Sequence, residues 1–163
     1  MALPQPQQTD RLLLPAVLRA MAICTLLSLT SCKHEKKIYS SHCDVDINFK
    51  RIGFRQLIDS IGNYDRQYVE VSGKYEEDRD LSALFSDSIL AGGSDNNALW
   101  VNFSQDCPLY QAGTHKGLFE YNDGQFTLLN NKTITIRGMI NLHNKGREKK
   151  YKATIERISL VKL

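Results

Sequence analysis

The chain has 163 residues, of which 24% are charged and 42% are hydrophobic, and its formal net charge is +3. This length accommodates one domain with an N-terminal extension, and the composition is that of a globular protein. Four cysteines are too few for a disulfide-dense scaffold, and the small net charge does not by itself predict a nucleic-acid partner.

The first 31 residues are typical of a secretory signal peptide. Arg11 and Arg19 are the basic residues ahead of an uncharged run over residues 20–29. The run is too short to span a membrane, which takes about 20 apolar residues. A basic segment, a short apolar run and small residues before a cleavage site form the layout of a secretory signal. We therefore expect residues 1–31 to be removed.

The end of this run resembles the lipobox of bacterial lipoproteins. Residues 29–32 read Leu-Thr-Ser-Cys, which follows the pattern aliphatic, small, small, cysteine. The resemblance implies that the Cys32 thiol receives a diacylglycerol, that the peptide is cut directly before it, and that the new amine is acylated. Several acyl chains are needed for stable anchoring, because one chain holds only weakly. The alternative, a buried cysteine ending an ordinary helix, fits less well because the charged residues 33–37 follow at once.

The segment after Cys32 predicts a tether. Residues 32–51 are mostly polar, so we expect a lipidated tether there and a folded domain over 52–163. A short strand over residues 45–49 is an equal alternative, because hydrophobic and polar residues alternate in it. Lys33 favours the outer membrane, since Gram-negative sorting systems use Asp at this position to retain lipoproteins in the inner membrane.

A helix is predicted next, followed by five strands. Phe54, Leu57, Ile58 and Ile61 have helical spacing, which indicates a helix over 54–62. The hydrophobic period then changes to two, which predicts strands over 67–76, 81–87, 98–103, 132–142 and 150–163. A change of parity between residues 155 and 158 indicates a β-bulge in the last strand. The segment 104–131 is expected to be irregular.

Two of the predicted strands resemble each other. Residues 69–73 read VEVSG and residues 134–138 read ITIRG, and a mid-strand glycine permits the bending that small barrels need. The five strands fit the five-stranded Greek-key barrel of the OB-fold, with a small antiparallel β-sandwich as the alternative. Residues 54–163 also resemble a recurring bacterial domain with a short helix, two V-x-V-x-G strands and a closing strand like YKATIERI. That resemblance implies an extracytoplasmic OB-type barrel and no assigned activity.

The cysteines of the mature chain indicate a disulfide. Cys43 and Cys107 would be exposed to the oxidising space outside the inner membrane, where paired cysteines are commonly oxidised. Two separate thiols, or a metal site completed by His42 and His115, are the alternatives. The spacing of these side chains matches no metal-binding pattern. We expect no metal and no cofactor.

A basic cluster lies between the last two predicted strands. It consists of Lys145, Arg147, Lys149, Lys150 and Lys152. Together with Trp100, Phe103 and Tyr151, such a cluster on an OB-like barrel is able to bind single-stranded nucleic acid. An envelope location favours anionic lipid or a protein partner instead. A solvated turn beside packed aromatic residues is the third interpretation.

The sequence contains none of the common hydrolase, metalloprotease or phosphate-loop motifs. We therefore expect a membrane-anchored bacterial envelope lipoprotein that acts as a non-enzymatic binding or interaction module, without nucleic acid. The alternatives are an envelope hydrolase with an unrecognised site and a purely structural envelope component.

Overall fold

The computed structural model describes residues 36–43, 46–87, 95–119 and 128–163. The predicted signal peptide and the lipidation site Cys32 lie outside the described residues. A compact unit spans Lys36–Leu163. No helix in the described ranges is long and apolar enough to cross a membrane.

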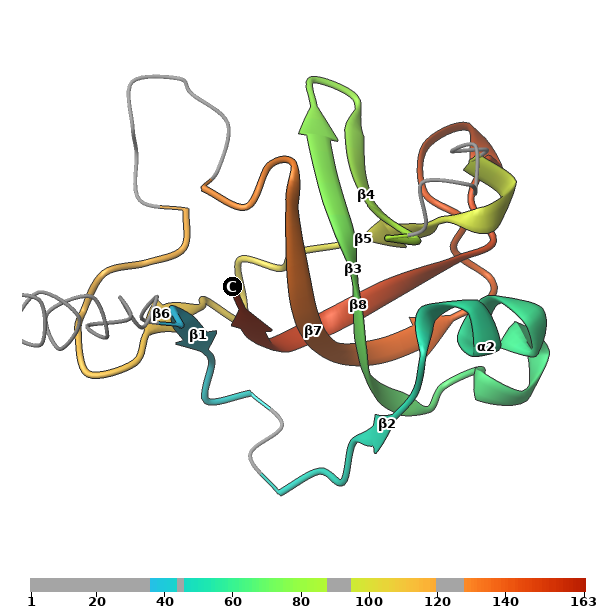
Figure 1. Cartoon of the computed structure of the whole chain (residues 1–163). Coiled ribbons are helices and arrows are strands. Elements are labelled where there is room, and N and C mark those ends of the chain that lie inside the picture. Colours follow the sequence, from blue (N-terminus) through green and yellow to red (C-terminus); the bar gives the residue numbers. More distant parts are fainter. Residues whose placement is uncertain (1–35, 44–45, 88–94, 120–127) are drawn as a thin grey trace, which may run out of the picture. The chain divides into compact units, whose positions relative to one another are not determined.

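Within the described residues, five strands close a barrel, as predicted. They are β3 (Tyr68–Asp78), β4 (Leu81–Phe85), β5 (Leu99–Val101), β7 (Lys132–Asn141) and β8 (Ala153–Lys162). The order around the barrel is β3-β4-β5-β8-β7 and back to β3 (Figure 1). All neighbours are antiparallel except β5 and β8, which are parallel. The fold is therefore a small, mainly β, OB-like barrel, and the sandwich alternative is wrong because the sheet closes on itself.

The barrel interior holds the core because side chains alternate along each strand. In β3, Val69 and Val71 point inward and are fully buried, whereas Ser72 is exposed. In β7, Ile134 and Ile136 are the buried inward residues. Alternation of this kind produces the period of two seen in the sequence.

The predicted helix is shorter than expected. Helix α2 (Phe54–Asp59) ends at Ser60, whose φ of −119° is not helical, and a 3₁₀ turn continues over Ile61–Tyr64. The Ser60 hydroxyl donates a hydrogen bond of 2.6 Å to the Gln56 carbonyl oxygen. The helix buries Leu57 in the core, and the turn buries Ile61 there. The apolar spacing in the sequence therefore marks the residues that pack into the core, even though the helix ends before Ile61.

The mid-strand glycines are explained by close packing. A Cβ on Gly138 would lie 2.7 Å from the carbonyl oxygen of Glu156, and one on Gly73 would lie 2.5 Å from that of Phe85. The predicted bulge in β8 lies beside Gly138, because Arg137 and Met139 of β7 pair with residues four apart in β8. Glycine at both positions therefore lets a neighbouring strand approach.

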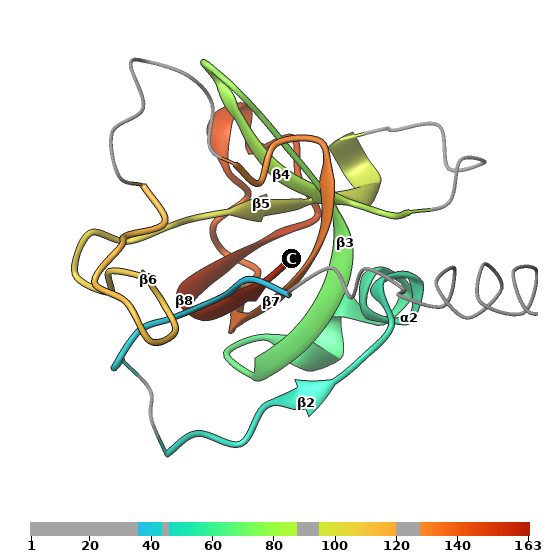
Figure 2. The ribbon, with the colours of Figure 1, turned by 60° about the vertical axis from the view of Figure 1, so that its left-hand side comes forward.

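The domain begins earlier than residue 52, where the sequence placed its start. Strand β1 (Ile38–Ser40) pairs with β8 and with β6 (Tyr110–Gln111), as Figure 2 shows, and β2 (Lys50–Arg51) pairs with β3. Tyr39 is buried against the core, which explains why this polar segment joins the fold. Residues 46–49 form no strand, and residues 44–45 lie outside the described residues. The described part of the predicted tether is thus largely attached to the barrel.

Candidate functional site

A buried carboxylate lies on the outer side of the barrel. Glu70 belongs to β3, between the inward-facing Val69 and Val71, so its side chain points away from the core. The residue is nevertheless only 5% exposed. Burying a carboxylate is costly unless partners compensate for the lost water, so its surroundings define the site.

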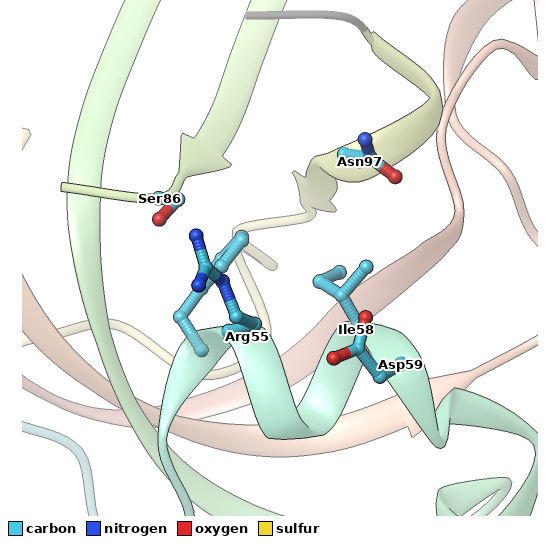
Figure 3. A pocket seen from close by; sticks show the side chains of 6 residues that line it. Arg55, Ile58, Asp59, Ser86 and Asn97 are labelled. Carbon is cyan, nitrogen blue, oxygen red and sulfur yellow. The ribbon is translucent and has the colours of Figure 1, made fainter. Parts of the chain in front are cut away.

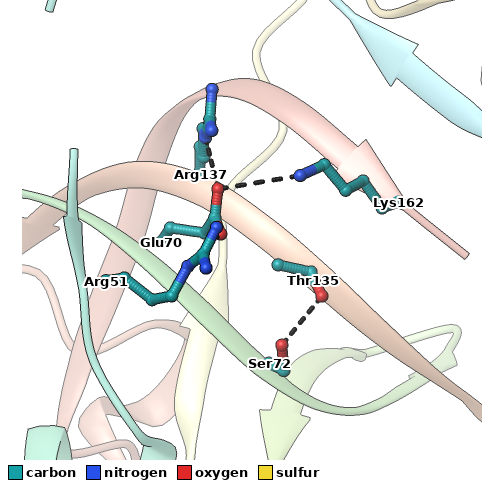
Figure 4. A network of polar contacts seen from close by, with 6 residues as sticks. All are labelled: Arg51, Glu70, Ser72, Thr135, Arg137 and Lys162. Atoms are coloured by element: carbon teal, nitrogen blue, oxygen red, sulfur yellow. Dashed lines mark hydrogen bonds and ion pairs between the residues drawn. The ribbon is translucent and has the colours of Figure 1, made fainter. Parts of the chain in front are cut away.

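Three cations from three different strands surround Glu70 (Figure 4). Arg51 of β2 donates from Nε to Oε1 at 2.9 Å, and Arg137 of β7 donates from Nε to Oε2 at 2.6 Å. Lys162 of β8 places its Nζ 3.8 Å from the same Oε2. Register explains the arrangement, because Glu70 lies directly opposite Arg51 on one side and Arg137 on the other.

The network keeps Glu70 ionised. Burial alone would raise its pKa, but hydrogen bonds from Arg137 and Arg51 and the positive charges of Arg137 and Lys162 outweigh burial, so the pKa lies below its ordinary value. A general acid or base works best with a pKa near the operating pH. A lowered pKa instead suits a permanent anion that positions the cations around it.

A shallow depression of about 580 Å³ opens beside this network. We call it the basic depression; its lining includes Lys36, Arg51, Glu70, Ser72, Thr135 and Lys162. The hydroxyl groups of Ser72 and Thr135 lie 2.8 Å apart and are hydrogen-bonded to each other. Cations outnumber the single carboxylate, so the basic depression suits an anionic group with several oxygen atoms.

The predicted basic cluster forms the turn between β7 and β8, which we call the hairpin tip (residues 142–152). Its arginine, Arg147, forms an ion pair with Asp80 of the β3–β4 turn, and Lys150 pairs with Glu148 at 2.5 Å. The remaining members, Lys145, Lys149 and Lys152, are exposed. The structure thus places the five predicted residues on one loop, with two of them also engaged in ion pairs.

The aromatic residues that the sequence analysis named together with the basic cluster are packed. Trp100 and Tyr151 have ring centroids 5.2 Å apart, and Gly146 lies so close that a Cβ there would be 2.6 Å from the Trp100 ring. Gly146 has φ of +67°, which favours glycine for a second reason. Phe103 packs against Phe119 at 4.9 Å. Trp100, Tyr151 and Phe103 are therefore each in contact with another ring, in agreement with the interpretation of packed aromatics.

Two other hollows differ in character. One, of about 150 Å³, lies between α2, the end of β4 and the 3₁₀ turn Asp95–Asn97, and is lined by Arg55, Asp59, Ser86 and Asn97 among others (Figure 3). It is smaller than the roughly 300 Å³ at which small-molecule sites begin. The other, of about 520 Å³, is mainly apolar and includes Phe119, which is 52% exposed.

The structure joins Cys43 to Cys107 through a disulfide, with Cα atoms 5.8 Å apart. The closed loop spans 64 residues, for which the chain-entropy account gives a stabilisation of about 4 kcal/mol. His42 and His115 are exposed. Among the described residues, no group of three or more His, Cys, Asp and Glu side chains is arranged to hold a metal ion.

The chain matches no protein-family model, no curated protein and no solved structure. A fold hosts many activities, so function must be argued from the sites themselves. Sequence reasoning missed the Glu70 network, because its members are single charges on strands far apart in the chain. The one available signal was a single charged residue, Glu70 or Arg137, at an outward position within each of two strongly alternating strands.

Replacing Glu70 tests whether the network stabilises the fold. For Glu70→Gln at neutral pH, we expect the free energy of unfolding to fall by about 1–3 kcal/mol, because two arginines lose a charged acceptor. Since the pKa of Glu70 is lowered in the fold, its stabilisation is present above the unfolded pKa and is lost as pH falls through the folded pKa. The deficit should therefore shrink in acid, as measured by urea unfolding across pH.

Glu76→Gln is the matched control, because Glu76 pairs with Lys74 at 2.7 Å at a partly exposed position of the same strand. Partly exposed pairs contribute about 0–1 kcal/mol. A deficit of Glu70→Gln that stayed constant as pH fell, or that equalled the deficit of Glu76→Gln, would show that the network has no special role.

Proposed function

We propose that this protein is a bacterial envelope lipoprotein, held to the membrane by lipid on Cys32, whose OB-like barrel is a non-enzymatic binding or interaction module. The outer membrane is the favoured location, in line with Lys33. One observation carries the proposal: strand β1 pairs with the C-terminal end of β8, whereas the hairpin tip directly precedes the N-terminal end of β8.

The N-terminal end of the domain lies at the C-terminal end of β8. Ile38 pairs with Lys162, and the Leu163 amide donates to the Lys37 carbonyl oxygen at 2.9 Å. Lys36 is four positions after Cys32, which corresponds to at most about 14 Å of extended chain. A lipid on Cys32 would therefore keep this end of the barrel beside the membrane.

The hairpin tip lies at the other end of β8. This strand has 10 residues and begins at Ala153, directly after the tip. At about 3.3 Å per residue it is about 30 Å long. Figure 1 shows the same separation, with β1 and the β7–β8 turn on opposite sides of the barrel. An anchored barrel would present the hairpin tip away from the lipid surface.

The hairpin tip has the features of an interaction surface. The ion pair between Arg147 and Asp80 connects it to the β3–β4 turn. In OB-folds, the corresponding two loops flank the strands that bind ligands. Lys145, Lys149 and Lys152 are exposed there, which suits an acidic surface of an envelope protein. Nucleic acid is not proposed as the ligand, because the neighbouring aromatic rings are packed.

Replacing Cys32 tests the anchor. The Cys32→Ser chain should incorporate no fatty acid and should remain uncut, because the hydroxyl cannot take the place of the thiol that receives the lipid. Metabolic labelling with a fatty acid, followed by intact-mass measurement, provides the readout. Cys43→Ser is the control and should label normally. Label retained by Cys32→Ser would refute the anchor.

Site-specific photo-crosslinking in intact cells tests the binding role. A photoreactive residue at position 149 should form discrete adducts with an envelope protein, and these should disappear when Lys145, Arg147 and Lys152 are all changed to Glu. Lys116→Glu, an exposed site on another loop, should leave the adducts unchanged. Absence of adducts from position 149, or adducts that survive the triple change, would contradict a binding role of the hairpin tip.

A further inference from the structure

The register of the sheet aligns a row of outward side chains across six strands. Arg51 pairs with Glu70, Glu70 with Arg137, and Arg137 with Leu160. Leu160 pairs with Ser40, and Ser40 with Tyr110. Directly opposed residues point to the same side of a sheet, so these side chains share one surface.

A second row runs beside the first. It follows the pairs Ser72–Thr135, Thr135–Lys162 and Lys162–Ile38. We call the two rows together the anchor-side face, and it consists of Ile38, Ser40, Arg51, Glu70, Ser72, Tyr110, Thr135, Arg137, Leu160 and Lys162. The basic depression forms one part of this face.

One half of the anchor-side face is positively charged and arranged for oxyanions. The side chain of Arg51 is 81% exposed although its Nε is held by Glu70. The bonds to Glu70 use Nε of each arginine, and a guanidinium group has four further N–H donors on its terminal nitrogens. Guanidinium donors in fixed positions match the geometry of phosphate. Lys36, at the rim, adds a further cation.

The other half has the character of a membrane interface. Tyr110 is 43% exposed, and Ile38 and Leu160 are partly exposed. Tyrosine is enriched where proteins meet the headgroup layer, because its ring is apolar and its hydroxyl is polar. Cations beside exposed apolar side chains are the combination that binds anionic membrane surfaces.

The chain leading to the lipid starts on this same face. Ile38 is a member of the second row and is six positions after Cys32, which limits the distance between the two to about 20 Å. A bilayer that held the lipid of residue 32 would therefore lie within reach of the anchor-side face. This places an anionic surface next to a cationic one without any additional partner.

We propose that the anchor-side face docks on anionic phospholipid headgroups of the leaflet that holds Cys32, with a lipid phosphate seated in the basic depression. This inference rests on the proposed lipid anchor. Docking fixes the orientation of the barrel, so that the anchored domain does not rotate freely about its tether.

Lysine acetylation of the full, natively processed protein in vesicles tests the docking. We compare vesicles that contain phosphatidylglycerol with vesicles of phosphatidylcholine alone, and measure the rate at each lysine by mass spectrometry. Each cation near an anionic surface contributes about a fivefold effect, so Lys36 and Lys162 should react about fivefold or more slowly in the anionic vesicles. Lys149 and Lys152 should react equally in both.

Arg51→Gln is the informative variant, because its exposed side chain can be shortened while Arg137 still holds Glu70. It should reduce the protection of Lys36 and Lys162 by about fivefold without changing the melting temperature by more than a few degrees. Arg79→Gln, an exposed site in the β3–β4 turn, is the matched control and should leave protection intact. Molar salt should abolish the protection, because the charges are then screened.

Each alternative outcome is distinct. Equal rates in both vesicle types, slowing at the hairpin tip, or protection unaffected by Arg51→Gln would overturn the docking. Protection produced equally by inorganic phosphate in neutral vesicles would assign the depression to a soluble anion and would also overturn it. An acylated Cys32 without protection overturns only the docking. An unmodified Cys32 in the intact mass overturns the proposed function itself, and the docking with it.

Discussion

The pairing of β1 with β8 is the constraint on which the rest of the structure depends. Three residues, Ile38–Ser40, add a strand to the C-terminal end of β8, and Tyr39 inserts into the core beside it. The segment that precedes the barrel is therefore part of the folded unit. The disulfide between Cys43 and Cys107 fastens the same segment a second time, to the chain between β5 and β6. The chain that enters the domain at Lys36 is therefore attached to the barrel at one defined place, the C-terminal end of β8.

Glu70 organises the charged side chains on the outer surface of the barrel. Its ionised side chain is buried, and each of its oxygen atoms accepts a hydrogen bond from an arginine of a different strand. Burying a carboxylate of this kind is costly, and the hydrogen bonds from Arg51 and Arg137 offset that cost. The same contacts hold the guanidinium group of Arg51 at the edge of the basic depression. One network therefore connects the short strand β2 to the barrel and shapes the charged surface that we propose as a lipid contact.

The barrel was predictable from the sequence because hydrophobic and polar residues alternate strongly in its strands. The repeated glycines, Gly73 and Gly138, lie where a neighbouring strand approaches closely. The parity change in β8 marks its irregular pairing with β7. The strand β1 was not predictable, because three residues in a polar segment carry no period and pair with residues at least 70 positions away in β6 and β8. The Glu70 network was missed because its members are single charges on separate strands. The hairpin tip was predictable as a run of charge, whereas its ion pair with Asp80 follows only from the way the two turns meet. The lipid anchor lies outside the described residues and stays a prediction.

The orientation of the anchored barrel is tested most directly by measuring the heights of two sites above the bilayer. Donor fluorophores placed at residue 40, in β1, and at residue 149, in the hairpin tip, would be compared in the acylated protein, with acceptors in the lipid headgroups. The account predicts stronger energy transfer from residue 40, with residue 149 farther from the surface by up to about 30 Å, the length of β8. Equal transfer from both sites, or stronger transfer from residue 149, would contradict it.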